Sequence, residues 1–404
     1  MPRMICAVGL IAAGLALNHN GALAAGKYDP GASDTEIKIG QTMAYSGPLS
    51  AFGAFGAVQA AYFDMINHKG GINGRKINFL SRDDGGNPAK TVEVTRKLVE
   101  DDQVLFLVGS SGTANNTAVQ RYLNAKQVPQ LFIGSGASKW GNYKEFPWSM
   151  GWAPDYRTEA AIYAQYILAN IPDAKIAILY QNDDFGKDLI AGMRAGLGER
   201  ADRMIVGQAS YELTDATVDS QIITLQASGA NVFLNGGSPK FAAQAIRKAS
   251  DISWRPQQFL AFVSTSIGAV LTPAGIDKSV GLMSIQFLKD ASDPRWASDP
   301  GLLQYLGFLK EYQPKASPND FIVAYGYTQI ETCGQVLRQA GDDLTHDNIM
   351  RQATNLKDLE LPLLLPGIKI NTSPTNYYPI TQAQLSRFDG KSWQLVGGVL
   401  GRSP

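Results

Sequence analysis

The stretch VLFLVGSSGT at residues 104–113 decides the fold prediction. Its first part, Val104–Gly109, is a continuous apolar run, which is typical of a strand buried on both faces of a parallel sheet. The small and hydroxylated residues that follow lead into a predicted helix over Thr113–Lys126. A buried strand that passes through a short polar turn into a helix is the repeating unit of an α/β fold.

The same alternation extends in both directions along the chain. Predicted strands cover residues 36–44, 76–82, 130–134, 175–180, 204–211, 231–235, 258–263, 281–287 and 368–370, with helices between most of them. A hairpin at Asp389-Gly390 joins two late strands, 385–388 and 393–396. An irregular aromatic joint, residues 138–156, divides the alternation into two arrays. The pattern predicts parallel sheets covered by helices on both faces.

Length and composition limit the function classes. The chain has 404 residues, of which 45% are hydrophobic, so two globular lobes are expected. Lys plus Arg and Asp plus Glu number 36 each. A nucleic-acid-binding protein normally carries a basic excess, so a nucleic-acid partner is not expected.

Residues 1–24 are predicted to be a secretory signal peptide. A basic start is followed by the apolar run Met4–Leu17 and by small residues that favour cleavage near Ala24. A membrane anchor is disfavoured because this run is shorter than the roughly 18–20 residues that span a bilayer. Cleavage removes Cys6, so Cys333 has no partner for an intrachain disulfide.

Recognisable catalytic and metal-binding motifs are missing from the sequence. There is no phosphate-binding loop, no nucleophile elbow and no cluster with metal-ligand spacing, and His68 and His346 lie far apart. The adjacent pairs Asp83-Asp84 and Asp183-Asp184 fit turn and helix-cap chemistry better than acid–base catalysis. We expect no catalytic residues, no metal and no cofactor, and an exported hydrolase is disfavoured.

Polar and small residues follow the predicted strands, and in open α/β sheets this edge holds the ligand. These strand-end segments are Tyr45–Phe52, Ser110–Thr113, Gly134–Ser138, Gln181–Gly186 and Gly236–Ser238. The second of them precedes a helix, whose N-terminus favours an anion such as a carboxylate. A plain helix cap explains Thr113 equally well. The aromatic joint could stack on a ligand, but packing between lobes is the favoured interpretation for most of its rings.

Five short motifs, in order along the chain, resemble one family of proteins. They are Ser46-Gly47-Pro48, KGGINGR at Lys69–Arg75, Asp83-Asp84, VPQLF at Val128–Phe132 and NDDFG at Asn182–Gly186. The chain resembles the substrate-binding proteins of ABC transporters of the branched-chain amino acid (leucine/isoleucine/valine-binding protein) type. The resemblance implies a type I periplasmic binding protein fold, with two Rossmann-like lobes, a three-segment hinge and a central cleft. Lobe 1 would hold residues 27–149 and 288–376, and lobe 2 residues 150–287 and 377–404.

The resemblance also implies a set of ligand-binding residues. The family's carboxylate seat corresponds to Thr113 with Ser111. The family's acidic residue for the ligand's α-ammonium falls near Val263, where no carboxylate stands. The remaining implied contacts are a second seat segment at Gly136 and Ser138, two rings that close over the ligand, Phe52 and Phe185, and Ser238, which matches a family tyrosine.

The family implies a periplasmic, monomeric receptor that delivers its ligand to an ABC permease. The expected ligand is an amino acid or a related small organic carboxylate. Burying an ammonium group without an acidic partner costs free energy. The missing acidic residue therefore favours a carboxylate ligand without an α-amine, and an aromatic acid is one candidate. Asp183 or Asp184 could replace the missing residue, which leaves amino acids open. The alternative is a sensor of the same fold that feeds a signalling partner.

Overall fold

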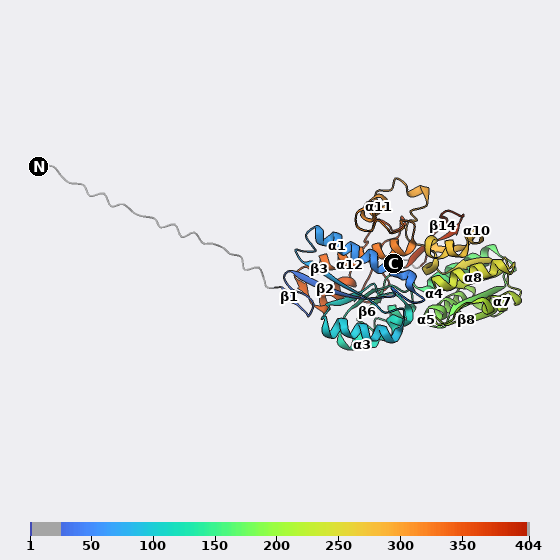
Figure 1. Cartoon of the computed structure of the whole chain (residues 1–404), viewed down its shortest axis with the longest axis horizontal. Helices are drawn as coiled ribbons and strands as arrows, with labels where there is room; N and C mark the ends of the chain where they lie inside the picture. Colours follow the sequence, from blue (N-terminus) through green and yellow to red (C-terminus); the bar gives the residue numbers. More distant parts are fainter. Residues whose placement is uncertain (2–25, 402–404) are drawn as a thin grey trace.

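The computed structural model describes Met1 and residues 26–401 (Figure 1). The predicted signal peptide, apart from Met1, and Cys6 lie outside the described residues. Two large sheets organise the described part of the chain. The first has the strand order β3 (Lys76–Asp83), β2 (Glu36–Met43), β4 (Phe106–Val108), β5 (Gln130–Ile133) and β6 (Ser149–Gly151), and its strands are parallel.

The second sheet combines the middle of the chain with its end. Its strand order is β14 (Trp393–Gly401), β13 (Gln382–Phe388), β11 (Met283–Gln286), β10 (Gln257–Leu260), β9 (Val232–Gly236), β7 (Ile176–Gln181) and β8 (Ile205–Tyr211). The strands from β8 to β11 are parallel, whereas β13 and β14 form an antiparallel hairpin on β11. The hairpin turn is held by the Asp389 carboxylate, which accepts bonds from the Lys391 and Ser392 N–H groups at 2.8 Å each.

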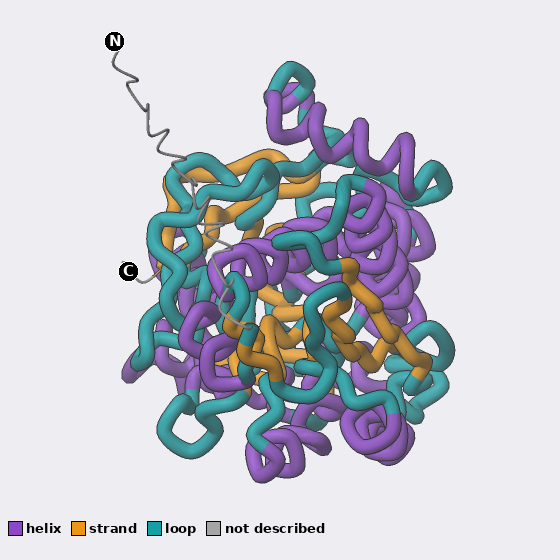
Figure 2. Tube along the Cα trace, turned by 90° about the vertical axis from the view of Figure 1, so that its left-hand side faces the viewer, coloured by secondary structure: helices purple, strands orange, loops and turns teal. Residues whose placement is uncertain are grey.

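Helices flank the strands (Figure 2). Their bounds are α1 (Gly53–His68), α2 (Pro88–Arg96), α3 (Thr113–Lys126), α4 (Tyr156–Asn170), α5 (Asp184–Leu197), α6 (Ala201–Met204), α7 (Asp219–Ala227), α8 (Pro239–Asp251), α9 (Thr272–Ala274), α10 (Ile276–Ser279), α11 (Pro300–Tyr312), α12 (Phe321–Ala340) and α13 (His346–Ala353). None of the helices in the described part of the chain has the length and apolar character needed to cross a bilayer.

The structure corrects two predicted strands: one is shorter than predicted, and the other does not form. The strand predicted over 258–263 ends at Leu260, and Phe262–Ser264 form a 3₁₀ turn. No strand forms over 368–370, where Ile370 makes only an isolated bridge to Leu359. The apolar side chains that suggested a strand there are buried in the core without a ladder of backbone bonds.

A buried ladder of three glutamines ties the late helix α12 to the first sheet. Gln41 on β2 donates to Gln59 on α1, and Gln59 donates to Gln329 on α12 at 2.6 Å. Gln329 then donates to the backbone carbonyl of Phe132 on β5 at 2.7 Å. Gly109 has φ +62°, and a Cβ there would lie 2.7 Å from the Gln59 amide nitrogen, so the crossing requires glycine.

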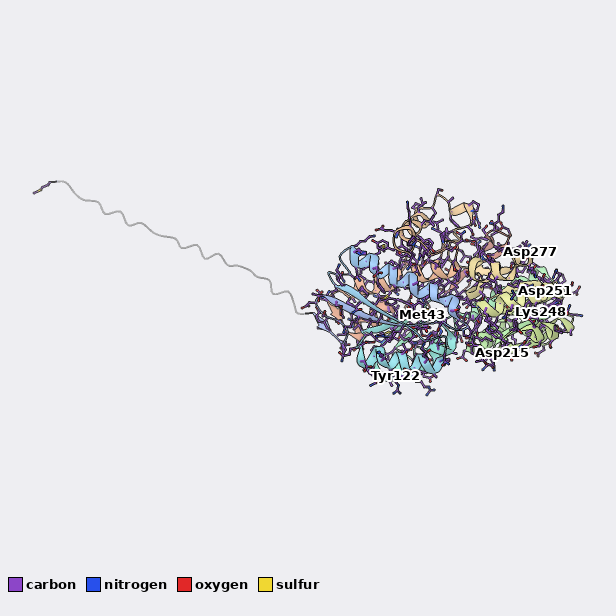
Figure 3. All side chains as sticks on the ribbon, viewed as in Figure 1. Met43, Tyr122, Asp215, Lys248, Asp251 and Asp277 are labelled. Carbon is purple, nitrogen blue, oxygen red and sulfur yellow. The ribbon has the colours of Figure 1, made fainter. Side chains whose placement is uncertain are left out.

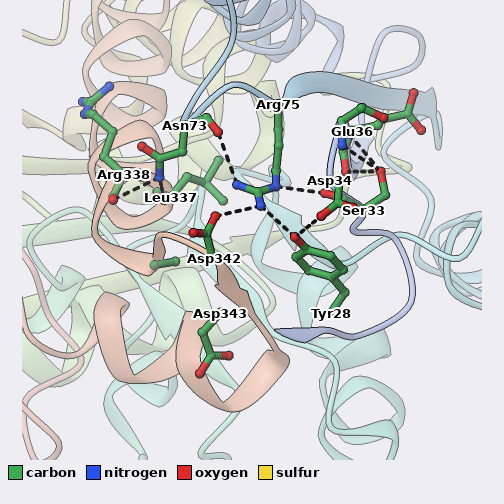
Figure 4. Close-up of polar contacts among 12 residues, drawn as sticks. Tyr28, Ser33, Asp34, Glu36, Asn73, Arg75, Leu337, Arg338, Asp342 and Asp343 are labelled. Carbon is green, nitrogen blue, oxygen red and sulfur yellow. Dashed lines mark hydrogen bonds and ion pairs between the residues drawn. The ribbon is translucent and has the colours of Figure 1, made fainter. Parts of the chain in front are cut away.

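The motif KGGINGR serves to hold the N-terminal strand in place. Arg75 is 4% exposed, and its guanidinium donates to the Ser33 carbonyl at 2.9 Å, to the Tyr28 hydroxyl at 2.8 Å and to Asp342 at 2.8 Å (Figure 4). Tyr28 lies on β1 (Lys27–Tyr28), which pairs in parallel with β12 (Asp343–Leu344). One buried side chain therefore joins three segments that are distant in sequence.

We expect Arg75→Met to lower the free energy of unfolding by about 2 kcal/mol, because several hydrogen bonds of roughly 1 kcal/mol each are lost. Denaturant unfolding measures this change. Arg121→Met is the matched control, since Arg121 pairs with Glu145 at 3.9 Å on the exposed surface and such pairs contribute about 0–1 kcal/mol. Equal effects of the two substitutions would contradict the role given to Arg75.

Candidate functional site

A cavity lies where the carboxyl ends of the strands in the two sheets meet, and we call it the cleft cavity. Its empty volume is about 390 Å³. Each sheet contributes loops or helix starts that follow its strands, which is the location expected for a ligand in an α/β fold. The lining residues are Leu49, Phe52, Gly112, Thr113, Ala114, Asn115, Gly134, Tyr156, Gln181, Phe185, Leu213, Ser238 and Val263.

A second space adjoins the first, and we call it the aromatic chamber. It is a narrow space that shares Phe52, Gly134 and Val263 with the cleft cavity. Its other lining residues are Phe55, Ser111, Phe262, Phe321, Ile322 and Tyr325. Met43 is buried at the end of β2 (Figure 3). Its sulfur accepts a hydrogen bond from the Ser111 hydroxyl at 3.3 Å.

Six of the eight residues singled out from the sequence line one of these spaces. Those lining the cleft cavity are Phe52, Thr113, Phe185, Ser238 and Val263, and Ser111 lines the aromatic chamber. Gly136 and Ser138 line neither space. Gly136 stands behind Tyr156, since a Cβ there would lie 2.9 Å from the Tyr156 ring. Ser138 gives its N–H and its hydroxyl to the Asp188 carboxylate, at 2.6 and 2.8 Å.

Helix α3 presents its N-terminus to the cleft cavity. No side chain of the described residues caps this end, and Gly112 before it adopts φ +90°, which favours glycine. The Thr113 hydroxyl lies 2.7 Å from the Ser135 hydroxyl. The Ser135 oxygen already accepts from Ala137 N and Trp140 Nε1. Either hydroxyl can be the donor in this pair, and the Thr113 proton is available to a ligand when Ser135 donates.

Asp183 and Asp184, the acidic residues beside the cleft cavity, are bound to other groups of the protein. Asp183 caps α5, accepting from the Phe185 N–H at 3.0 Å, and also accepts from Gln181 Nε2 at 2.7 Å. Burial raises the pKa of Asp183 to about 6. Asp184 pairs with Lys139 at 3.1 Å. Among the described residues that line the cleft cavity, none carries a charged side chain.

The loop that carries Val263 is fixed from behind by a buried acid. The Glu159 carboxyl accepts from the Phe262 N–H at 2.6 Å and from the Tyr163 hydroxyl at 2.7 Å. Burial raises the pKa of Glu159 to about 8. Because the backbone of the loop is held, the half-buried Val263 side chain reaches both the cleft cavity and the aromatic chamber.

Three polar residues that line the cleft cavity were not among the eight singled out from the sequence. Tyr156 belongs to the aromatic joint, and its ring packs on Phe185 at 4.6 Å. Gln181 begins the strand-end segment 181–186, which gave a signal that could have been followed. The sequence gave no signal for Asn115, because the position of its side chain depends on the packing of α3 on α2. Its amide nitrogen donates to Thr91 at 2.7 Å, and its oxygen has no partner among the described residues.

Comparison with known proteins agrees with this geometry. A model of the periplasmic binding protein family matches residues 36–391. The Leu/Ile/Val-binding protein homolog 1 of Brucella abortus (strain 2308) is 24% identical over 323 residues, covering 78% of this chain and 81% of that one.

Two solved structures have the same fold. A branched-chain amino acid ABC transporter protein from Thermus thermophilus with bound valine has a TM-score of 0.81 at 15% identity, over 92% of this chain and 98% of that one. A fatty acid ABC transporter substrate-binding protein from Thermomonospora curvata has a TM-score of 0.79 at 18% identity, over 93% and 95%. The predicted type I periplasmic binding protein fold is confirmed. The chain belongs to the periplasmic binding protein family, and it is a ligand-binding protein rather than an enzyme.

Proposed function

We propose that this protein is the monomeric, periplasmic solute-binding component of an ABC importer and that it binds a small organic carboxylate without an α-amine. The ligand occupies the cleft cavity and is then delivered to the membrane permease. One observation carries the proposal: an uncapped helix N-terminus, which attracts an anion, faces a cavity whose described lining has no charged side chain.

The anion end of the ligand has a defined place. The first N–H groups of α3 have no intrahelical acceptor, and α3 has 14 residues, so its N-terminus carries a substantial positive potential. The Thr113 hydroxyl adds a donor at the same point when Ser135 donates to it. A carboxylate that accepts these bonds is stabilised without a cationic side chain, because hydrogen bonds to an ionised acceptor are stronger than neutral ones.

An α-ammonium has no matching partner in the same space. The acceptors among the described lining side chains are neutral, such as the free oxygen of Asn115, and burying an ammonium without a carboxylate costs several kcal/mol. The resemblance to the family places its acidic residue near Val263, which has no carboxylate. One structural neighbour is named for fatty acids, which are acids without an amine. Another was solved with bound valine, which is a zwitterion.

Binding would close two lobes over the ligand. We assign residues 27–149 and 288–376 to lobe 1, and residues 150–287 and 377–404 to lobe 2. In support, α12 packs on α1 beside the first sheet, and β13 and β14 extend the second. A ligand that touches Thr113 from one side and Ser238 from the other stabilises the closed arrangement, since only there are both contacts made.

A matched ligand pair tests the missing ammonium seat. We expect 4-methylpentanoate to bind at least about tenfold more tightly than leucine, a difference of about 1.4 kcal/mol, because the two differ only in the α-ammonium. Isothermal titration calorimetry on the mature protein measures both affinities. Submicromolar leucine binding that is tighter than that of the acid would refute the proposal.

A substitution at the helix N-terminus tests the carboxylate seat. Thr113→Val keeps the shape of the side chain and removes its proton, so carboxylate affinity should fall roughly 10- to 150-fold, in line with one hydrogen bond to a charged group. Thr117→Val is the control, since Thr117 lies on the same helix, accepts from Lys139 at 3.2 Å and does not line the cleft cavity. An unchanged affinity in Thr113→Val would show that the anion binds elsewhere.

Restoring an acid at residue 263 should reverse the ligand preference. In Val263→Glu, the new carboxylate can pair with an α-ammonium, so affinity for the amino acid should rise and affinity for the amine-free acid should fall. Val263→Gln has nearly the same size without the charge and controls for crowding. If the Glu and Gln variants have the same preference, residue 263 does not face the α-position of the ligand.

A further inference from the structure

The aromatic chamber is lined by one buried tyrosine whose hydroxyl has no partner among the described residues. Tyr325, on the second turn of α12, is 5% exposed and lines the chamber. Its hydroxyl makes no hydrogen bond with any described residue. By contrast, the Trp152 ring that packs on it at 4.8 Å donates its indole N–H to Thr332 at 2.9 Å.

The rest of the chamber is apolar and built from rings. Tyr325 lies 4.8 Å from Phe55 and 5.9 Å from Phe321 between ring centroids, and Phe262 lies 6.2 Å from Phe321. The other hydroxyl of the chamber, on Ser111, is directed to the Met43 sulfur. Such walls favour a flat aromatic ring, which can pack edge-on or offset against them.

The polar groups of buried side chains usually have hydrogen-bond partners in native structures. The unpartnered Tyr325 hydroxyl belongs to a space that adjoins the cleft cavity. The shared residues Phe52, Gly134 and Val263 form the junction, with Thr113 on one side and Tyr325 on the other. A ligand held by its carboxylate at Thr113 would pass its remaining atoms across this junction toward Tyr325.

We propose that Tyr325 is a specificity-determining residue that selects a hydroxyaryl carboxylate, an acid whose aromatic ring carries a hydroxyl group away from the carboxylate. The ring packs against the aromatic walls of the chamber, and its hydroxyl forms a hydrogen bond with the Tyr325 hydroxyl. This inference rests on the proposed carboxylate receptor and adds to it the polar group at the far end of the ligand.

Three pairs of acids measure how much the ring hydroxyl contributes to affinity. The pairs differ in the number of carbon atoms between the ring and the carboxylate. They are benzoate and 4-hydroxybenzoate, phenylacetate and 4-hydroxyphenylacetate, and 3-phenylpropanoate and 3-(4-hydroxyphenyl)propanoate. Calorimetry on the wild-type protein should give at least one pair in which the hydroxylated acid binds about tenfold more tightly or better, since a site built to bond a hydroxyl rejects the analogue that lacks it. Ratios near one in all three pairs would overturn the inference.

The variant Tyr325→Phe identifies the protein group responsible. It should lower the affinity for the hydroxylated acid about tenfold or more and leave the unsubstituted acid unchanged, so that the ratio falls toward one. Tyr327→Phe is the matched control, because Tyr327 lies on the same helix, bonds to Gln304 at 3.3 Å and lines neither space. If Tyr325→Phe weakens both acids equally, the hydroxyl has only a structural role and the inference fails.

The same titrations distinguish failure of the role given to Tyr325 from failure of the proposed carboxylate receptor. If unsubstituted aryl acids bind but the hydroxyl adds nothing, the carboxylate receptor stands and the role of Tyr325 is wrong. If no acid binds while phenylalanine or tyrosine does, the carboxylate receptor itself is wrong and the inference falls with it.

Discussion

The glutamine ladder from Gln41 through Gln59 to Gln329 is the contact on which the site depends. Buried amides must be paired, and in a low-dielectric interior a fully satisfied chain of hydrogen bonds tolerates little displacement. The ladder brings α12 back to the first sheet and ends on the carbonyl of Phe132. Phe132 is a buried residue with φ +49°, a conformation that needs support from its surroundings. The strand end that leads to Gly134 is therefore held in place.

The charges near the site are arranged so that none enters the cavity. Asp183 is used as a helix cap, Asp184 is paired with Lys139, and Asp188 binds Ser138 and Arg157. Recognition is left to backbone N–H groups, hydroxyls, amides and rings. Neutral groups of this kind discriminate by whether each one finds a partner, because an unpaired polar group is penalised more than a paired one is rewarded.

Sequence reasoning identified residues that share one cavity because parallel strands place their carboxyl ends at one edge. The segments that hold Phe52, Thr113, Phe185 and Ser238 could therefore be found from strand ends alone, and all four residues line one cavity. Ser138, predicted in the same way, lines neither space, and its hydroxyl donates to Asp188. Nothing in the local pattern shows which of several polar residues in a strand-end segment turns toward the ligand and which toward a neighbouring helix.

The sequence by itself determined the α/β class, the order of most strands and helices, and the absence of recognisable catalytic motifs, because hydrophobic periodicity and turn chemistry are local properties. Only the tertiary structure decided that α12, more than 180 residues after β5, supplies Phe321 and Tyr325 to the aromatic chamber. It also decided that Asn115, Tyr156 and Gln181 line the cleft cavity. The direction of a side chain, and whether its hydroxyl finds a partner, depends on contacts between segments that are distant in sequence, which no local pattern specifies.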